Sequence, residues 1–487
     1  MFATLILASI GLSMAGGVLI KKLKISRKAA GIGSLACLAV SAALALCSLL
    51  LSPKEPFTLL KISENVTVSF YLDGMNRFYL VLISCVWTLV GLYALEYTEH
   101  DENAPSFFRY YLLSFGALVG LSASNNLITL YMFYELMTLL TVPLVAHNRD
   151  KQSVAAAVKY LLYSVFGASA ALLGVFFVAS WAGTTRFAAG GVFDAQTLEK
   201  HAAALRIVFF VMILGFGVKA GMFPMHSWLP TAHPVAPAPA SAVLSGVITK
   251  MGVLGIVRTV FYISGASFLR GTWVQYAFMT LTLITVVMGS TLAFKEKLFK
   301  KRLAYSTVSQ VSYVLFGLST LTQAGFIGAC LHIIFHSLIK NTLFMSAGAV
   351  IHKTRITEVD SLRGIGKRMP VTMVLFTVVS LGLIGIPPSG GFVSKWNLAQ
   401  GTLSTGYAAS WIGPACLLLS AILTAAYLMS ISIKAFYTGQ DEPGGEKCEA
   451  GLKMLLPMAV FALLSVLLGM FPGGIVRFFT SVAEGLF

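Results

Sequence analysis

Ionisable side chains interrupt otherwise apolar stretches of this sequence, and their types are those that exchange protons. A charged side chain at the centre of a bilayer costs about 2.5–3.5 kcal/mol on insertion scales, so each such residue requires a reason for its presence. Lysine, histidine and glutamate hold or release a proton according to their burial and their neighbours. We interpret the set as a proton or ion path made of Glu135, Lys219, Lys250, His332, His336, Lys340 and Lys395.

Glu135 and Lys219 are the predicted acid–base pair of this path. Glu135 lies within LITLYMFYELMTLLTVPL, well away from either end of that stretch. We place Lys219 in the middle of an apolar helix that begins near Arg206. The proton affinity of a buried lysine depends strongly on nearby charge, so a carboxylate beside it makes a natural relay. The alternative is a pair that is neutralised purely for packing.

A proline-rich segment separates Lys219 from Lys250. It reads KAGMFPMHSWLPTAHPVAPAPASAVLSGVITK, and we expect a second apolar helix to begin at about Ala240. Proline has no N–H and clashes with the preceding turn, so this run must be broken or looped. Breaks at membrane depth persist only where protein or a water-filled cavity satisfies the freed backbone groups. The prolines of the run are Pro224, Pro230, Pro234, Pro237 and Pro239.

His332, His336 and Lys340 follow one another at four-residue intervals, which places all three on one face of a helix. Two histidines four residues apart can ligate zinc, but no third ligand or carboxylate accompanies them. A proton or water chain fits better, because histidine titrates near neutral pH. We therefore predict no metal and no cofactor.

The second break lies in LGLIGIPPSGGFVSKW, at Pro387 and Pro388, with Lys395 just beyond it. Gly- and Pro-interrupted segments in corresponding positions of two halves point to the ion path of a transporter. Lys395 would sit near the mouth of this break, or would instead extend to the membrane surface.

Three further residues are candidates for proton uptake or gating. Lys159 is either an uptake residue or an interface anchor, since it lies near the end of its helix. His226 and His233 flank the first break, where they either gate protons or cap loop carbonyls. We expect Asp73 and Arg77 to set a membrane interface.

The composition indicates a polytopic membrane protein. The chain has 487 residues, of which 57% are hydrophobic and 11% are charged, whereas soluble domains carry about 25% charged residues. Its length fits about fourteen spans of about 20 residues. The expected spans are 1–20, 29–51, 73–95, 109–123, 125–147, 154–181, 205–222, 240–263, 272–294, 303–320, 323–349, 370–394, 408–437 and 452–472.

The net charge of +16 comes from basic loops rather than from a nucleic-acid-binding surface. Each basic loop follows an odd-numbered span, so the positive-inside rule places both termini outside the cytoplasm. The first segment lacks the basic start of a signal peptide and is expected to be retained. These loops contain Lys21, Lys22, Lys24, Arg27 and Lys28; Lys295, Lys297, Lys300, Lys301 and Arg302; and Lys353, Arg355, Arg363, Lys367 and Arg368.

Enzyme signatures are missing from the sequence. It has no phosphate-binding loop, no dinucleotide-binding glycine motif, no serine elbow and no haem-attachment motif. Its six cysteines form no CxxC pair, so iron–sulfur ligation lacks support. We expect the protein neither to hydrolyse nucleotide nor to carry electrons itself.

Four motifs resemble the antiporter-like subunits shared by respiratory complex I, Mrp-type sodium/proton antiporters and membrane-bound hydrogenases. They are FYELMTLLTVP, the proline-rich segment, HIIFHSLIKNTLFMSAGAV and IPPSGGFVSKW. The resemblance implies an all-α fold of fourteen helices, with two inverted five-helix repeats formed by spans 4–8 and 9–13. The corresponding domains are 1–108, 109–263, 264–437 and 438–487. It also implies an ion path along the membrane midplane and assigns the seven residues above to that path.

The resemblance further implies partners and a location. We expect other membrane subunits, including further antiporter-like ones, in the plasma membrane of a prokaryote. The stretch AHPVAPAPASAVLSGVITKMG favours a hydrogenase or related ferredoxin-linked complex with iron–sulfur subunits, ahead of a Mrp D-type subunit or a complex I subunit. The chain ends soon after its last span, so we expect neither the long lateral helix of the largest complex I relative nor the extension of the largest Mrp subunit.

Two functions of other classes stay open at this point. The chain could be a scaffold whose polar residues serve only packing, or an independent transporter of a small organic solute. The absence of a roomy midplane site with aromatic and amide groups argues against the second.

Overall fold

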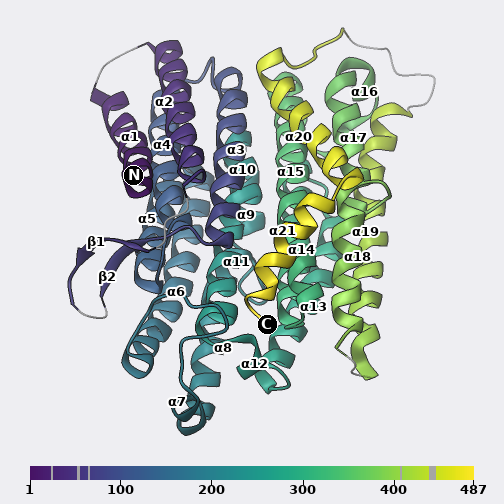
Figure 1. The fold of residues 1–487 in the computed structure, drawn as a ribbon. Coiled ribbons are helices and arrows are strands. Elements are labelled where there is room, and N and C mark those ends of the chain that lie inside the picture. The colour runs from purple at the N-terminus through teal and green to yellow at the C-terminus, as the bar shows by residue number, and fades with distance from the viewer. Residues whose placement is uncertain (23–25, 52–54, 64–65, 406–407, 438–445) are drawn as a thin grey trace.

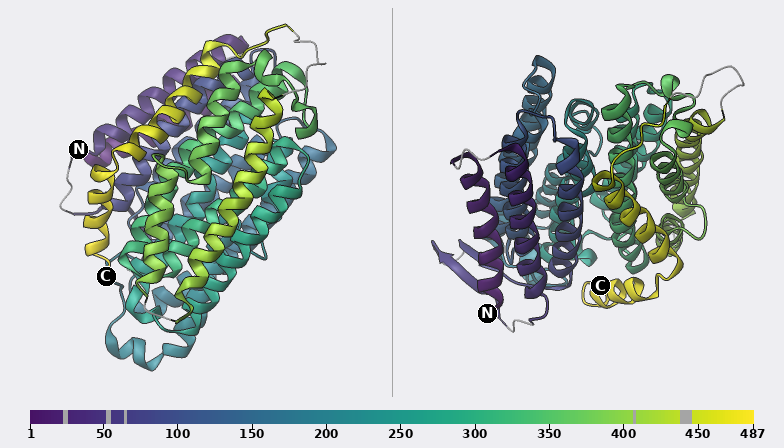
Figure 2. Two further views of the ribbon diagram at one scale, coloured as in Figure 1. Left: turned by 90° about the vertical axis from the view of Figure 1, so that its right-hand side faces the viewer. Right: turned by 90° about the horizontal axis from the view of Figure 1, so that it is seen from above.

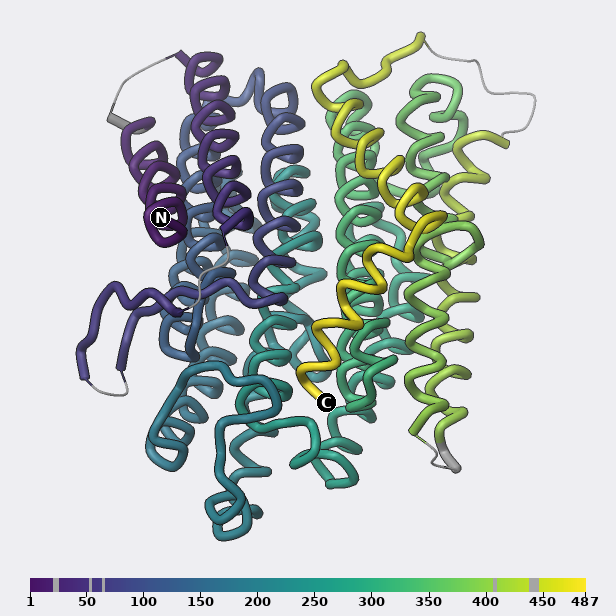
Figure 3. Tube along the Cα trace, in the orientation of Figure 1, coloured from purple at the N-terminus to yellow at the C-terminus, as the bar shows by residue number. Residues whose placement is uncertain are grey.

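The computed structural model describes residues 1–22, 26–51, 55–63, 66–405, 408–437 and 446–487. Lys24 and the expected domain boundary at residue 438 lie outside these ranges. Long helices run beside one another, with the first helices of the chain on one side of the molecule and the last on the other (Figures 1 and 2). Figure 3 traces the path, in which the C-terminal segment crosses the front of the bundle.

The helices follow the apolar segments, and many begin at a capping side chain. Asp73, Asn126, Asp150 and Thr322 each accept a hydrogen bond from the backbone N–H three residues later, which satisfies a donor that the first turn leaves free. The helices of the first half are α1 (Phe2–Lys22), α2 (Arg27–Ser48), α3 (Gly74–Tyr97), α4 (Ala104–Ser122), α5 (Leu127–Val145), α6 (Lys151–Ala182), α7 (Ala195–Lys200), α8 (Ala202–Ala220), α9 (Leu229–Val235), α10 (Ala238–Val243) and α11 (Thr249–Val257).

The second half is equally helical. Its α-helices are α12 (Ala266–Leu269), α13 (Trp273–Lys295), α14 (Phe299–Ser319), α15 (Gln323–Thr354), α16 (Ile365–Arg368), α17 (Pro370–Ile384), α18 (Gly390–Leu403), α19 (Ile412–Phe436), α20 (Leu452–Met470) and α21 (Gly473–Glu484). Short 3₁₀ segments occur at η3 (Val359–Leu362) and η4 (Ala408–Trp411).

Eleven helices of the described chain are long and apolar enough to cross a membrane. Three of the expected spans are not among these eleven helices. They correspond to α4, α14 and the pair α17–α18. The first turn of α14 carries three consecutive basic residues, which lowers its hydropathy. The break before α18 leaves α17 with only 15 residues. The structure therefore shows a multi-span helical protein.

A two-stranded hairpin departs from the all-helical prediction. β1 (Phe57–Lys61) pairs in antiparallel fashion with β2 (Thr67–Phe70), and Phe57 lies opposite Phe70. The hairpin projects from the side of the bundle (Figure 1). All four residues of β2 are buried, whereas most of β1 is exposed. Strands of four or five residues are too short to show a clear alternation, which is why sequence reasoning missed them.

The expected eighth span is one buried helical rod with two π-helical segments. It begins at Ala238, close to the predicted Ala240, and is buried throughout. Its π-helical segments are η1 (Leu244–Ile248) and η2 (Arg258–Ile263). Lys250 lies two residues after the end of η1, and π-helical insertions of this kind occur frequently at functional sites.

Candidate functional site

Lys219 lies in the last turn of α8 and not in the middle of its helix as predicted. The helix ends there because Gly221 adopts a left-handed conformation, with φ of 80°, which glycine reaches without strain. The side chain is completely buried. Its ammonium donates to the hydroxyls of Thr138 (2.8 Å), Tyr160 (3.2 Å) and Ser164 (2.9 Å).

Glu135, the predicted acid–base partner of Lys219, makes no direct ion pair with it among the described residues. In the described chain no ion pair within 4 Å joins the two residues, and Oε1 of Glu135 is buried without a hydrogen-bond partner. Thr138, which accepts from Lys219, lies one turn after Glu135 on α5 and therefore on the same face. The contacts of the Lys219 ammonium are therefore made by hydroxyl groups, one of which lies a helical turn from Glu135 along α5.

Other protein groups form hydrogen bonds with the backbone N–H and C=O groups that the first break leaves without helical partners. A break within an apolar region requires such partners. The N–H of Phe223 donates to Thr285 Oγ1 (3.0 Å), and the N–H of Met222 donates to the carbonyl of Gly217 (2.9 Å). The indole of Trp228 donates to the carbonyl of Val218 (2.8 Å). The break contains Pro224, and the chain becomes helical again at α9.

Lys250 and His336 form the central contact of the site. Both side chains are completely buried, and Nζ of Lys250 lies 2.7 Å from Nδ1 of His336. Lys250 also donates to the carbonyl of Ser245, which the π-helical segment η1 presents to it. Two basic nitrogens at this distance can share or pass one proton, because either can hold it.

Helices α8 and α11 approach closely between Lys219 and Lys250. A Cβ atom at Gly252 would lie 2.6 Å from the carbonyl oxygen of Phe216 and 3.1 Å from Cβ of Lys219. Glycine at this position therefore permits the contact between the two helices. Within the described chain no hydrogen bond joins the two lysines directly.

His332 connects the central contact to the second break. Its ring stacks with that of His336, with centroids 6.0 Å apart. Nδ1 lies 2.9 Å from Ser394 Oγ, and Nε2 lies 3.2 Å from Gln310 Oε1. Ser394 is the residue before Lys395, so α18 presents both side chains near the same break.

Lys395 turns back into the break instead of extending to the surface. Its ammonium donates to the carbonyls of Leu383 (2.7 Å) and Ile384 (2.9 Å), which end α17. The break at Pro387 and Pro388 removes the next helical donors from these carbonyls, and the lysine replaces them.

Lys340 makes no hydrogen bond to either histidine in the described chain. It donates to Ser306 Oγ (2.6 Å) and to the carbonyl of Leu303 (3.1 Å), both on α14. Ser306 also accepts from the hydroxyl of Tyr427 (2.8 Å) on α19. Lys340 therefore begins a separate polar branch.

The candidate uptake residues gather around α9. Lys159 donates to Thr231 Oγ1 (3.2 Å). His233 is completely buried, stacks on Phe344 at 4.7 Å, and has no described partner at either ring nitrogen. Nδ1 of His226 is buried without a partner in the described chain. The carbonyls of Pro234 and Ala236 accept from Lys300, so His233 does not cap them.

Sequence reasoning missed several polar partners. One hydroxyl around Lys219 follows helical spacing from a residue already chosen, since Thr138 lies three positions after Glu135. Tyr160 and Ser164 are four residues apart on one face of α6, but no residue already chosen points to that face. Lys300 was assigned to a loop but is nearly buried. The partners that sequence reasoning did not name are Thr138, Tyr160, Ser164, Ser306, Gln310, Ser394 and Tyr427.

Asp73, which we expected to set a membrane interface, makes contacts within the protein. It caps α3 and binds the buried guanidinium of Arg258 through two contacts of 2.5 and 2.9 Å. Arg258 was not chosen from the sequence, and it also stacks over Tyr262 at 4.2 Å. Among the described residues no group of three or more histidine, cysteine or acidic side chains is placed to hold a metal ion.

The fold and site together define a helical membrane protein with a buried line of lysines and histidines at its centre. The chain belongs to the family described as "NADH:quinone oxidoreductase/Mrp antiporter, TM", whose family model matches residues 124–428. A second model, described as "NADH-Ubiquinone oxidoreductase (complex I), chain 5 N-terminus", matches residues 60–108.

Relatives come from three kinds of complex. The chain is 31% identical over 418 residues to NADH-quinone oxidoreductase subunit N of Desulforudis audaxviator, covering 83% of this chain and 82% of that protein. It is 31% identical to Na(+)/H(+) antiporter subunit A1 of Staphylococcus haemolyticus, with 84% and 53% covered. It is 29% identical to Hydrogenase-4 component B of Escherichia coli, with 84% and 63% covered. The chain thus spans less than two thirds of each of these last two proteins.

Solved structures share the fold over nearly the whole chain. The Mrp complex from Dietzia superposes with a TM-score of 0.86 at 20% identity, covering 100% of this chain and 97% of that one. The archaeal membrane-bound sulfane sulfur reductase gives 0.85 at 21% identity, covering 99% and 97%. Complex I from Thermus thermophilus gives 0.81 at 24% identity, covering 99% and 100%. The resemblance to antiporter-like membrane subunits of such complexes is confirmed.

Proposed function

We propose that this protein translocates protons, or exchanges sodium for protons, as a membrane subunit of a multisubunit complex. The contact that carries the proposal is the 2.7 Å distance between Nζ of Lys250 and Nδ1 of His336. These groups lie at the centre of the buried line, and neither has access to solvent. A proton held between them can leave only along the line.

The proposed path begins at the side of Lys159, His226 and His233. Protons then occupy Lys219 and Lys250 in turn, with water or side-chain rotation bridging the two. They leave through His336 and His332 toward Lys395, and Lys340 forms a branch. Glu135 adjusts the proton affinity of Lys219 without contacting the ammonium, since two charges interact at a distance.

The finer architecture belongs to the same proposal. We propose fourteen spans, in which α4, α14 and the broken pair α17–α18 join the eleven apolar helices. The two inverted repeats would occupy 109–263 and 264–437, preceded by 1–108 and followed by 438–487. Two breaks, one beside Lys219 and one beside Lys395, support this division. Both termini would lie outside the cytoplasm of a prokaryotic cell.

We propose a hydrogenase or related ferredoxin-linked oxidoreductase as the complex, on the motif AHPVAPAPASAVLSGVITKMG. A Mrp antiporter and complex I have relatives of similar identity, so they are the named alternatives. Gentle purification of the tagged subunit distinguishes them by what accompanies it. Iron–sulfur or nickel–iron subunits indicate a redox complex, whereas only small hydrophobic subunits indicate an antiporter.

Lys250→Ala tests the function in the assembled complex reconstituted into liposomes. We expect coupled ion transport to fall about 100-fold, the scale of a positioned proton-transfer group, while the complex still assembles. Lys200→Ala is the matched control, because Lys200 is exposed at the end of α7. Normal transport by Lys250→Ala would mean that the subunit is a scaffold with respect to this path.

A further inference from the structure

The π-helical segment η1, in the buried rod that carries Lys250, is held by side chains as well as by its own backbone. Nζ of Lys250 donates to the carbonyl of Ser245, and Oγ1 of Thr249 donates to the same carbonyl at 3.0 Å. Oγ of Ser337 on α15 donates to the next carbonyl, that of Gly246, at 2.7 Å. π-helical turns are rare and occur mostly as single turns at functional sites. These side-chain donors therefore help to keep the turn in place.

Ser337 comes directly after His336, so two neighbouring residues of α15 contact the same rod. His336 meets Lys250 at 2.7 Å, and Ser337 binds the carbonyl of Gly246. Gly246 and Lys250 are four residues apart and therefore lie about one turn from each other on the same side of the rod. All four residues are buried. The hydroxyl of Ser337 thus fixes the approach of α15 to the rod about one turn from the contact between Lys250 and His336.

Gly246 allows the two helices to come this close. A Cβ atom at this position would lie 2.2 Å from Nδ2 of Asn341, which follows Ser337 by one turn on the same face of α15. Nδ2 of Asn341 donates to the carbonyl of Ser337 at 2.8 Å, so the amide is held where it would meet an added methyl group. The close approach is therefore made by backbone and small polar groups.

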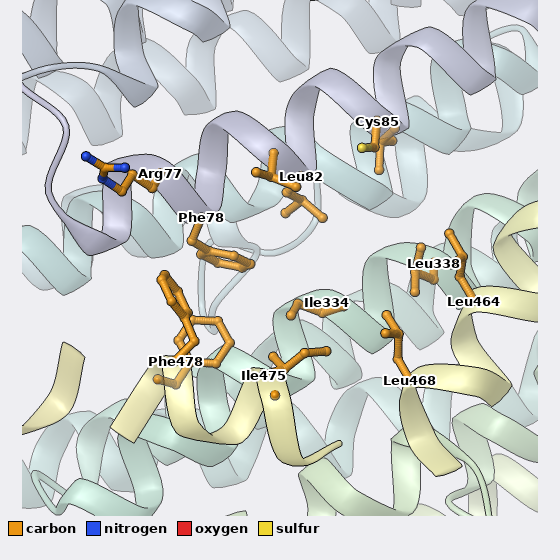
Figure 4. Close-up of a pocket in the computed structure, with 14 residues that line it drawn as sticks. Arg77, Phe78, Leu82, Cys85, Ile334, Leu338, Leu464, Leu468, Ile475 and Phe478 are labelled. Atoms are coloured by element: carbon orange, nitrogen blue, oxygen red, sulfur yellow. The ribbon is translucent and has the colours of Figure 1, made fainter. Parts of the chain in front are cut away.

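The opposite side of α15 gives the helix less support at this level. Ile334 and Leu338 each lie two residues from His336, and two residues turn an α-helix by about 200°. Both side chains line an apolar cavity of about 420 Å³ that faces α3 and α20 (Figure 4). Side chains that border a cavity lose the packing contacts on that side. The position of α15 here therefore depends on its contacts with the rod.

We propose that Ser337 is a positioning residue, whose hydroxyl holds the Gly246 carbonyl in the π-helical turn and thereby keeps Lys250 at proton-transfer distance from His336. Direct proton transfer requires the two nitrogens to lie within about 2.6–3.2 Å of each other, so a small shift of either helix interrupts it. The inference rests on the proposed function, because it assumes that a proton passes between these nitrogens.

Ser337→Ala tests this role in the assembled complex reconstituted into liposomes. The variant removes the hydroxyl donor from the Gly246 carbonyl, and we expect proton transport to fall about tenfold or more, since a misplacement of about 1 Å can cost about 100-fold. Thr342→Val is the matched control and should transport nearly as fast as the unaltered protein. Thr342 is equally buried on α15, and among the described residues its hydroxyl bonds only to the carbonyl of Leu338 in the same helix.

The ratio of transport rates in H₂O and D₂O separates positioning from a general loss of structure. It should rise in Ser337→Ala, because transfer between Lys250 and His336 becomes the slow step. A merely structural loss would lower transport and leave the ratio at the value of the unaltered protein, and that result would overturn the proposal.

A second-site rescue tests the close approach of the helices. Gly246→Ala should reduce transport at least as much as Ser337→Ala, because the added methyl group meets the amide of Asn341. Asn341→Ala removes that amide, so the double variant should regain most of the lost transport, with Asn341→Ala alone as the reference. A double variant as slow as Gly246→Ala would show that the spacing of the two helices does not control transport, against the proposal.

Lys250→Ala, measured in the same series, distinguishes this inference from the proposed function. If Lys250→Ala is inactive while Ser337→Ala transports as fast as Thr342→Val, the positioning role is overturned and the proposed function stands. If Lys250→Ala transports normally, the proposed function is overturned, and no proton transfer is left for Ser337 to position.

Discussion

Two lysines stand beside the two helix breaks, and the protein binds them differently. Lys219 is held by three side-chain hydroxyls from α5 and α6. Lys395 is held by two backbone carbonyls at the end of α17. A hydroxyl both donates and accepts and can rotate, so it can remain bonded when the lysine loses its proton. A carbonyl only accepts, and the end of a helix favours a positive charge.

The difference indicates different duties for the two lysines. The surroundings of Lys219 suit a residue that changes its charge, whereas those of Lys395 suit a residue that also caps α17 and closes the break. Four predictions test this comparison.

Lys219→Met should have the largest effect on transport, a loss of about 100-fold, with little effect on thermal unfolding. The hydroxyls it leaves behind can pair with one another, as Tyr160 already does with Thr141 at 2.8 Å. Proton uptake by proteoliposomes of the intact complex and thermal unfolding of the same preparation measure the two quantities. Lys219→Arg keeps the charge but cannot release a proton, so it should be equally inactive. An active arginine variant would show that charge alone suffices.

Lys395→Met should affect the unfolding temperature more, and transport less, than Lys219→Met does. Two partly buried carbonyls lose their donor, at a cost of up to about 1–3 kcal/mol each, so the unfolding temperature should fall. We expect transport to fall only about tenfold, because the lysine orders the break. Lys434→Met, at an ion pair with Asp360 on the protein surface, is the control and should change neither quantity. If Lys395→Met unfolds at the same temperature as the unaltered protein, the capping duty is wrong.

Ser394→Ala tests whether the line of histidines reaches the second break. It removes the hydroxyl 2.9 Å from Nδ1 of His332. One lost hydrogen bond of about 1 kcal/mol should slow transport about fivefold. Ser465→Ala is the control, since among the described residues Ser465 hydrogen-bonds only to the carbonyl of Ala462 in its own helix. Equal rates in the two variants would remove Ser394 from the path.

Glu135→Gln should have the smallest effect, because hydroxyls rather than the carboxylate contact the ammonium. A separated charge interaction of about 1 kcal/mol would change the transport rate up to about fivefold. The rate is to be compared with that of Thr138→Val, which removes a direct partner of Lys219 and should slow transport more. Complete inactivity of Glu135→Gln would show instead that the carboxylate itself carries a proton.

Much of the site could be predicted from residue types and breaks. Burial of Lys219, Lys250, His332, His336 and Lys340 follows from their place in apolar stretches, and the structure confirms it. The breaks at Pro224 and at Pro387 and Pro388 follow from the chemistry of proline. The hydroxyls that contact Lys219, in place of a direct contact with Glu135, could not be predicted, because helical periodicity does not give the rotation of one helix against its neighbour.

The sequence by itself determined the class of protein, the positions of its breaks and the burial of the lysines and histidines within apolar stretches, since these depend on local composition and on proline; it did not reveal the burial of Arg258 or Lys300. Only the tertiary structure decided the partners. Lys250 and His336 are 86 residues apart and meet through the packing of two buried helices. The same packing brings Arg258 to Asp73 across 185 residues and opens the apolar cavity behind α15. Such contacts depend on how whole helices fit together, and no local pattern contains that information.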